Sequence, residues 1–137
     1  MISQRHLARV VVMQALFAFF TRPNTDLKSN LDHAISVFPV KLKKDFFAIE
    51  LAEGSLENKK KIEKNIALHT KNKTLEKIDF LTLAILFIST FEMCFSGNKL
   101  PIPIIINEAV ELAKEYGKDT SPALVNAVLS SMANNLK

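Results

Sequence analysis

Residues 79–95 read DFLTLAILFISTFEMCF, a segment that is apolar on nearly every side of a helix. A helix of this kind belongs in a membrane or in the interior of a helical protein. Polar and acidic residues from Asp79 to Glu92 interrupt the run, so that it lacks the roughly 20 apolar residues of a membrane span. The segment therefore predicts a central buried helix.

Two further helices are expected after this segment. Residues 104–116 carry apolar residues at helical spacing and end at Gly117, which we expect at the C′ position. Ser121 as N-cap and Pro122 at the first helical position are in the preferred order for a helix start. The last helix is expected to turn five residues inward: Leu124, Val125, Val128, Leu129 and Met132.

Two helices are expected at the beginning of the chain. Ser3 is a good N-cap, and the helix that follows it contains no Gly or Pro as far as Phe20. A cap at Thr25 or Asp26 begins a second helix, which ends at Phe38 because proline follows.

Residues 42–69 predict one long helix before the central segment. Gly54 is expected to kink or break it, because glycine costs roughly 1 kcal/mol relative to alanine in a helix interior. Its expected inward residues are Phe46, Ile49, Leu56, Ile62 and Ile66.

The composition fits a single all-α domain over residues 1–137. Of 137 residues, 48% are hydrophobic and only three are glycine, which argues against both disorder and an all-β fold. A chain of this length can bury roughly two-thirds of its unfolded surface and needs no disulfide. Cys94 is the only cysteine, and a lone thiol among apolar neighbours suggests burial and a reducing cytoplasm.

Motifs for catalysis, metal binding or a cofactor are not found in the sequence. The three glycines lie far apart, so no phosphate-binding loop is expected. His6, His33 and His69 have no metal-ligand spacing with Cys94 or an acid. We therefore expect a protein that is not an enzyme and that uses neither metal nor cofactor.

The formal net charge is +4, and positive charge is concentrated at the N-terminus. Residues 1–25 contain three arginines and no acid. Arg5 and Arg9 are one helical turn apart, so we expect them to face outward together. The lysines at positions 59–61 and 64 alternate with Glu57 and Glu63 and are better explained as a solvated helix face.

Four segments resemble the NusB family of transcription antitermination factors. Residues 7–17, LARVVVMQALF, resemble its opening helix, in which Ala-Arg precedes Gln-Ala-Leu-aromatic. Residues 106–117, INEAVELAKEYG, are similar almost residue for residue to its penultimate-helix signature. LVNAVL at 124–129 resembles the final-helix signature, and residues 86–93 fit the central pattern. Residues 24–75 align by hydrophobic pattern alone.

The resemblance implies a NusB-like single domain of two packed three-helix bundles. It also implies binding of single-stranded boxA-type RNA in ribosomal RNA transcripts, together with NusE, a ribosomal small-subunit protein. The pair would help RNA polymerase in an antitermination complex to resist termination, in the cytoplasm and without a membrane. Catalysis has no part in this role.

The resemblance places Arg5, His6, Arg9 and Phe17 in the RNA-contacting helix. Guanidinium groups can neutralise phosphates and stack on unpaired bases, and His6 can do either weakly. Phe17 keeps the stacking face of the tyrosine common in the family but lacks its hydroxyl. Asn107 and Asn126 are family landmarks that we expect to be buried and structural, capping helices or cross-linking them through backbone hydrogen bonds. Glu108 is also expected to be structural.

The chain also departs from the family's pattern and would have a more apolar RNA site. Six positions carry the departures: Thr82, Leu83, Phe87, Ala123, Leu124 and Ala127.

Two alternatives to a free-standing antitermination factor are considered. The main alternative is a self-associating NusB-fold interaction module with weakened RNA binding. It rests on an apolar strip that is expected beside the arginines and consists of Met13, Leu16 and Phe20. A monomer is favoured over a homodimer, because Leu27 and Leu31 can cover this strip. The RNA-binding domain fused ahead of ribosomal RNA cytosine methyltransferases would need a further segment after residue 137.

Overall fold

The computed structural model describes residues 3–42, 46–70, 75–97 and 100–136. This part of the chain contains seven α-helices and one short 3-10 helix, and no strand. The elements are α1 (Gln4–Thr21), α2 (Leu27–Val37), α3 (Phe46–Glu57), α4 (Lys59–Leu68), η1 (Leu75–Lys77), α5 (Phe80–Cys94), α6 (Ile102–Tyr116) and α7 (Ser121–Asn134). The predicted all-α class is confirmed.

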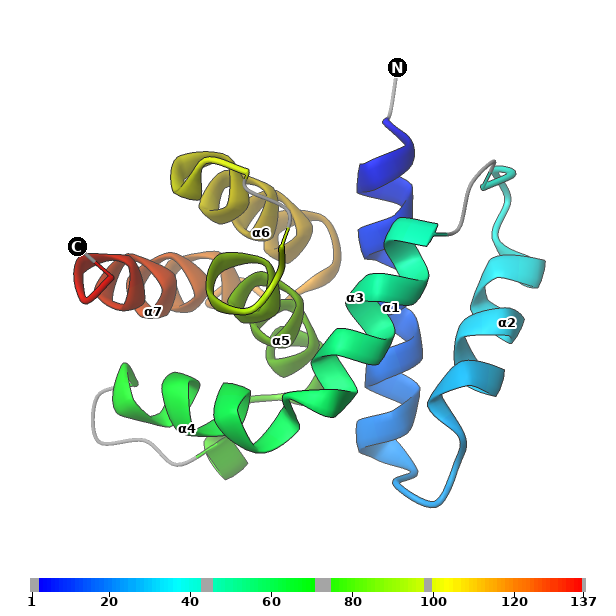
Figure 1. Ribbon diagram of the computed structural model, residues 1–137, viewed down its shortest axis with the longest axis horizontal. Coiled ribbons are helices and arrows are strands. Elements are labelled where there is room, and N and C mark those ends of the chain that lie inside the picture. The colour runs from blue at the N-terminus through cyan, green and yellow to red at the C-terminus, as the bar shows by residue number, and fades with distance from the viewer. Residues whose placement is uncertain (1–2, 43–45, 71–74, 98–99, 137) are drawn as a thin grey trace.

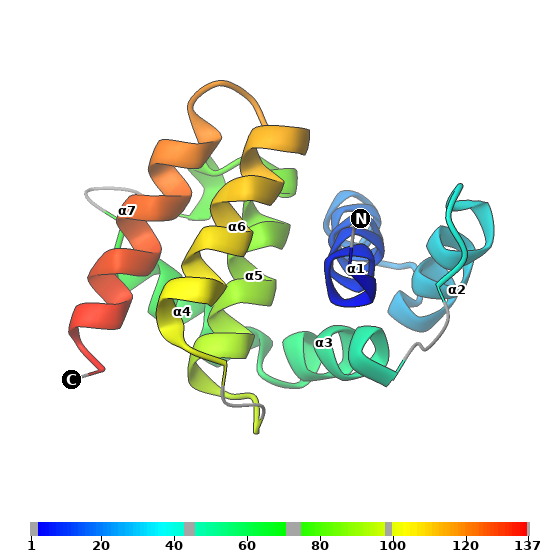
Figure 2. The ribbon, with the colours of Figure 1, turned by 90° about the horizontal axis from the view of Figure 1, so that it is seen from above.

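The helices form two groups that meet along α5 (Figure 1). Helices α1, α2 and α3 pack against one another, and α5, α6 and α7 make the second bundle with α4 packed beside them. Figure 2 shows α5 between α6 and α1, and α5 also packs against α3. The expected pair of three-helix bundles is thus present, with α4 as an addition to the second.

Helix α5 is the centre of the hydrophobic core. Every residue from 82 to 92 is buried, and Ile85 and Leu86 have no exposed surface. Each fully buried side chain of this size stabilises the fold by about 1.5–3 kcal/mol. The predicted central buried helix is confirmed.

Three helices begin with side-chain caps. Ser3, Asp26 and Asp79 each accept a hydrogen bond from the backbone N–H three residues further on, at 3.0, 3.1 and 3.1 Å. This confirms Ser3 and decides between the two candidates for α2 in favour of Asp26. Burial by itself raises the pKa of Asp79, but hydrogen bonds from Thr82 and the charge of Lys118 bring it below its ordinary value.

The single helix predicted over residues 42–69 is wrong, because two helices, α3 and α4, meet at Asn58. Asn58 has φ −102° and ψ 17°, outside the helical range. Its backbone N and its Nδ2 both donate to the carbonyl oxygen of Gly54, at 3.0 and 2.8 Å. The side chain of Asn58 thus caps the end of α3, four residues after the glycine that we expected to break the helix.

Gly54 lies inside α3 and is buried against α5. A methyl group at this position would overlap the ring of Phe91. The inward face of α3 is made of small residues with one leucine: Ala48, Leu51, Ala52, Gly54 and Ser55. This composition lets α3 approach α1 and α5 closely.

The expected inward residues of α3 are wrong, whereas those of α4 are confirmed. Phe46, Ile49 and Leu56 are 78%, 36% and 42% exposed, since the small residues take the core side of α3. Ile62 and Ile66 of α4 are fully buried.

The start of α6 and the conformation of Gly117 differ from the prediction, whereas the last helical residue, Tyr116, is the predicted one. The helix begins at Ile102, because Pro103 fits a first turn, where a backbone N–H has no helical partner. Gly117 ends the helix with φ −87°, which is not the left-handed conformation of a C′ glycine. Glycine is needed there for space, because a Cβ atom would lie 2.7 Å from Cβ of Ser121.

Ser121 is not the N-cap of α7, a position that Thr120 holds without a side-chain hydrogen bond. The buried Oγ of Ser121 accepts a hydrogen bond from the backbone N of Lys118 at 3.1 Å and is hydrogen-bonded to Thr82 Oγ1 at 2.8 Å. Thr82 Oγ1 in turn donates to Asp79 Oδ1 at 2.8 Å. This chain of hydrogen bonds fastens the start of α7 to the start of α5, and gives the departure at Thr82 a structural role.

Cys94 closes α5 and is half-buried rather than fully in the core. Its Sγ lies 3.9 Å from Sδ of Met132. Burial raises the pKa of the thiol, so a smaller fraction is thiolate at neutral pH than in a free cysteine.

A buried ion pair joins the two groups of helices. Nε and Nη2 of Arg9 in α1 donate to Oε2 and Oε1 of Glu92 in α5, each at 2.9 Å. The two side chains are only 4% and 5% exposed. A guanidinium and a carboxylate paired in this forked way satisfy each other's charge and hydrogen bonds inside the core.

Replacing Gly54 by alanine is expected to lower the free energy of unfolding by about 1–3 kcal/mol, because Phe91 must move to admit the methyl group. Gly97 is the matched control, since a Cβ atom there meets no neighbour within 4 Å. Urea denaturation of the two variants measures the difference. Equal stability of Gly54→Ala and Gly97→Ala would contradict the close packing of α3 on α5.

Replacing Arg9 by methionine is expected to lower the free energy of unfolding by about 3–5 kcal/mol, because Glu92 is left charged and unpaired in the core. The double variant Arg9→Met/Glu92→Leu should recover most of this loss, since no charge remains buried. Arg5→Ala is the control and should change stability by about 0.5 kcal/mol or less. If Arg9→Met were as stable as Arg5→Ala in urea denaturation, the pair would not be structural.

Candidate nucleic-acid interface

The first turn of α1 carries two of the predicted site residues. Ser3 Oγ accepts from the backbone N of His6 and so fixes the start of the helix. Arg5 is exposed, as predicted, and its guanidinium carbon lies 4.4 Å from the centroid of the Phe47 ring of α3. Arg5 therefore presents its charge at the surface where α1 and α3 meet.

Arg9 does not face outward with Arg5, and that prediction is wrong. The residue is 3% exposed and is held by Glu92. Helices α3 and α5 cover this side of α1, one turn beyond Arg5. The sequence argument counted only the acids near Arg9 along the chain, whereas Glu92 lies 83 positions away.

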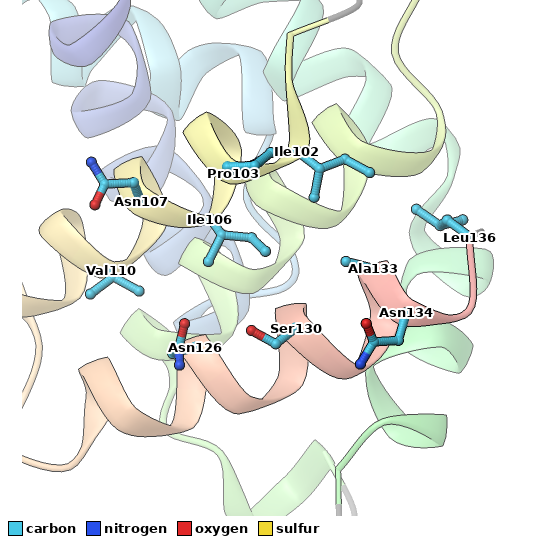
Figure 3. A pocket seen from close by; sticks show the side chains of 10 residues that line it. All are labelled: Ile102, Pro103, Ile106, Asn107, Val110, Asn126, Ser130, Ala133, Asn134 and Leu136. Carbon is cyan, nitrogen blue, oxygen red and sulfur yellow. The ribbon is translucent and has the colours of Figure 1, made fainter.

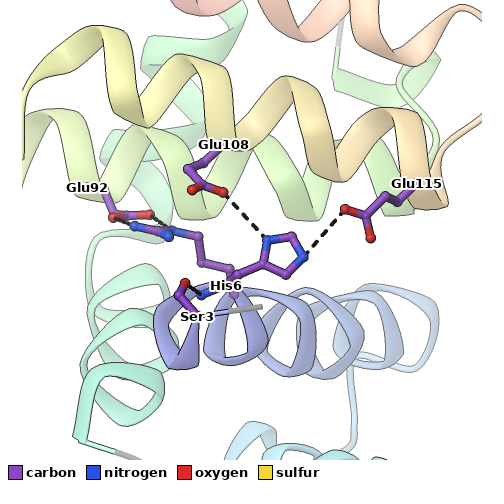
Figure 4. A network of polar contacts seen from close by, with 6 residues as sticks. Ser3, His6, Glu92, Glu108 and Glu115 are labelled. Atoms are coloured by element: carbon purple, nitrogen blue, oxygen red, sulfur yellow. Dashed lines mark hydrogen bonds and ion pairs between the residues drawn. The ribbon is translucent and has the colours of Figure 1, made fainter. Parts of the chain in front are cut away.

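The side chain of His6 extends from α1 toward α6 and contacts two carboxylates there. Its Nδ1 is 3.5 Å from Oε2 of Glu108 and its Nε2 is 3.4 Å from Oε1 of Glu115. Figure 4 shows the ring pointing at α6 between these side chains. Only a protonated histidine has donors on both nitrogens, so both contacts are ion pairs in that form alone. The expected structural role of Glu108 agrees with this contact.

Phe17 lies near the other end of α1 and is 41% exposed. It borders a hollow of about 220 Å³, which Thr21, Arg22 and Asn30 also line. It lies twelve positions after Arg5, a rise of about 18 Å along the helix axis. An exposed ring and an exposed guanidinium are therefore both present on α1, but well apart.

Phe20 and its neighbours do not form the exposed apolar strip that we expected beside the arginines. Met13 and Leu16 are each 1% exposed. The ring of Phe20 packs against α5, 4.9 Å from the ring of Phe87 between centroids. Phe87, one of the six departures from the family's pattern, is thus part of the core and offers no charge to a ligand.

Asn107 and Asn126 are exposed, and the prediction that they are buried cross-links is wrong. They line a groove of about 610 Å³ between α6 and α7 (Figure 3). Its other walls are mainly apolar, with Ile102, Ile106 and Val110 on the α6 side. No charged residue is among those that line the groove in the described part of the chain.

Helix α4 carries its lysines on a solvated face, as expected. Lys59 pairs with Glu63 at 3.0 Å, and Lys60, Lys61 and Lys64 are exposed.

Sequence reasoning missed two residues of this interface. Glu92 could have been suspected, because a charge inside the most apolar helix requires a partner. Phe47 gave no such signal, since it lies in the region that matched by hydrophobic pattern alone.

Metal and membrane sites are not indicated in residues 3–42, 46–70, 75–97 and 100–136. No three side chains of His, Cys, Asp or Glu there are grouped as metal ligands would be. None of the helices described has the length and apolar character that a bilayer span requires.

Comparison with known proteins agrees with the resemblance seen in the sequence. The transcription antitermination protein NusB of Bacillus pumilus is 37% identical over 134 residues, which cover 98% of each chain. The structure of T. maritima NusB has a TM-score of 0.86 at 29% identity, covering 98% of this chain and 93% of that one. A solved complex of antitermination factors NusB and NusE with double-stranded RNA contains a chain of the same fold, with a TM-score of 0.85 at 20% identity and coverage of 98% and 99%.

The family model "NusB family" matches residues 6–134, which include all seven α-helices except the first two residues of α1. With this match and relatives above 30% identity over nearly the whole chain, the chain belongs to the NusB family.

Proposed function

We propose that this protein is a transcription antitermination factor that binds boxA-type single-stranded RNA of ribosomal RNA transcripts together with NusE. The observation that carries the proposal is the family match over residues 6–134, in a chain whose first helix exposes Arg5 and Phe17. The solved complex of a NusB with NusE and double-stranded RNA supports NusE and RNA as partners, whereas the single-stranded boxA-type form of that RNA rests on the family resemblance. The protein would act within the antitermination complex of RNA polymerase in the cytoplasm, and not as an enzyme.

Arg5 and Phe17 supply the two kinds of contact that unpaired RNA needs. A guanidinium neutralises phosphate or stacks on a base, and an exposed phenyl ring stacks on a base without regard to its identity. The rise of about 18 Å between them is enough for several nucleotides of an extended strand. Arg5 would therefore bind the backbone at one end of α1, and Phe17 a base at the other.

The other two predicted residues contribute less directly. His6 would reach a phosphate only by giving up Glu108 or Glu115, both of which repel RNA. Arg9, buried with Glu92, holds α1 in place instead of binding the strand. With so few cations on α1, affinity for RNA alone would be modest, and NusE would supply much of the binding energy.

A monomer is the proposed state of the free protein. The self-associating alternative rested on an exposed strip of Met13, Leu16 and Phe20, and these residues are covered by the chain's own helices. Leu27 and Leu31 of α2 are buried as well. The strip on which the self-associating alternative rested is therefore covered within one chain.

Binding to a fluorescent boxA-type RNA, measured with and without NusE, tests the proposed function. Arg5→Ala should weaken binding about tenfold, as for one charge-assisted hydrogen bond, whereas Lys60→Ala on α4 should leave it unchanged. The logarithm of the affinity of the protein alone should fall with the logarithm of salt concentration at a slope of about −0.7 to −1.4, for one or two phosphate contacts.

Two results would contradict this proposal. One is the absence of RNA binding in the presence of NusE. The other is a loss on Lys60→Ala as large as that on Arg5→Ala, which would move the RNA site to α4. A duplex of the same sequence, measured in parallel, shows whether unpaired bases are needed.

Sedimentation equilibrium over a hundredfold range of protein concentration tests the monomer. The expected mass is that of one chain, 15.4 kDa, at every concentration. A mass that doubles as concentration rises would restore the self-associating alternative.

A further inference from the structure

The ring of Phe47 in α3 lies between the exposed arginine of α1 and the buried one. The guanidinium carbon of Arg5 is 4.4 Å from its centroid, and that of Arg9 is 5.1 Å away. The ring itself is half-buried and packs against the hydrophobic core, so it does not move freely. One aromatic side chain thus connects the surface of α1 with the Arg9–Glu92 pair beneath it.

The charges around the ring favour an interaction with Arg5 in particular. An arginine over an aromatic face is attracted by the ring's negative quadrupole. Arg9 would compete for this attraction and repel Arg5, but its charge is neutralised by Glu92 at 2.9 Å. The exposed guanidinium therefore lies against the ring through a contact that depends on its charge.

We propose that Phe47 is a positioning residue for RNA binding, which holds the Arg5 guanidinium at the boundary of α1 and α3 for contact with a phosphate. This inference rests on the proposed function. An arginine has several rotatable bonds, and ordering it costs about 1.5–2 kcal/mol of side-chain entropy. A ring that orders Arg5 before RNA arrives removes part of that cost from binding.

Phe46, the neighbouring residue, provides a matched control. It is also a phenylalanine of α3, is 78% exposed, and makes no aromatic contact with an arginine in the part of the chain that the structure describes. Replacing either residue by leucine removes one phenyl ring from the same helix while keeping an apolar side chain.

The test measures binding of the fluorescent boxA-type RNA, with NusE present, to a set of variants. Phe47→Leu should weaken binding about two- to fivefold, the range of an exposed cation–π contact, whereas Phe47→Tyr and Phe46→Leu should bind like the unaltered protein. In an Arg5→Ala background, Phe47→Leu should cause no further loss, because the residue acts through Arg5. Circular dichroism checks that each variant is folded.

A spectroscopic measurement without RNA reports on the contact itself. The ring current of Phe47 should shift the NMR signals of the Arg5 side chain, and this shift should disappear in Phe47→Leu and persist in Phe46→Leu. Failure of the unaltered protein to bind RNA overturns the proposed function along with this inference. If the unaltered protein binds RNA and Phe47→Leu binds equally well, or weakens binding equally with and without Arg5, only the inference is overturned.

Discussion

The buried ion pair between Arg9 and Glu92 fixes how the two halves of this protein meet. Glu92 is the only charged residue of α5, and its position in the core requires a partner of opposite charge. Arg9 provides that partner from α1 through two hydrogen bonds, so α1 must lie on α5 in one register. Arg5 lies one turn nearer the start of α1 and is exposed at the edge of α3. Its guanidinium lies over the ring of Phe47.

The same arrangement leaves little positive charge on the proposed RNA face. Of the two arginines in α1, one is neutralised in the core, and His6 faces two glutamates of α6. Phe87, a departure from the family's pattern, is part of the core and adds no charge to this face. A protein built in this way would depend on the placement of a single guanidinium and on its partner NusE more than on a broad basic surface.

The features predicted correctly from the sequence are those that neighbouring residues determine. The cap at Ser3, a cap at Thr25 or Asp26 and the all-round apolar character of α5 are local patterns, and the structure confirms them, with Asp26 as the second cap. The errors concern contacts between distant segments. The small-residue face of α3 is set by its closeness to α5, and the burial of Arg9 by an acid 83 positions away. Contact of RNA with Arg5, His6 and Phe17 stays a prediction.

Crosslinking of RNA to the protein tests most directly whether α1 is the RNA face. A boxA-type RNA carrying 4-thiouridine is irradiated in complex with this protein and NusE, and the crosslinked peptides are identified by mass spectrometry. Crosslinks to residues of α1, near Arg5 and Phe17, are the predicted result. Crosslinks confined to the lysines of α4, or to the groove between α6 and α7, would contradict the account.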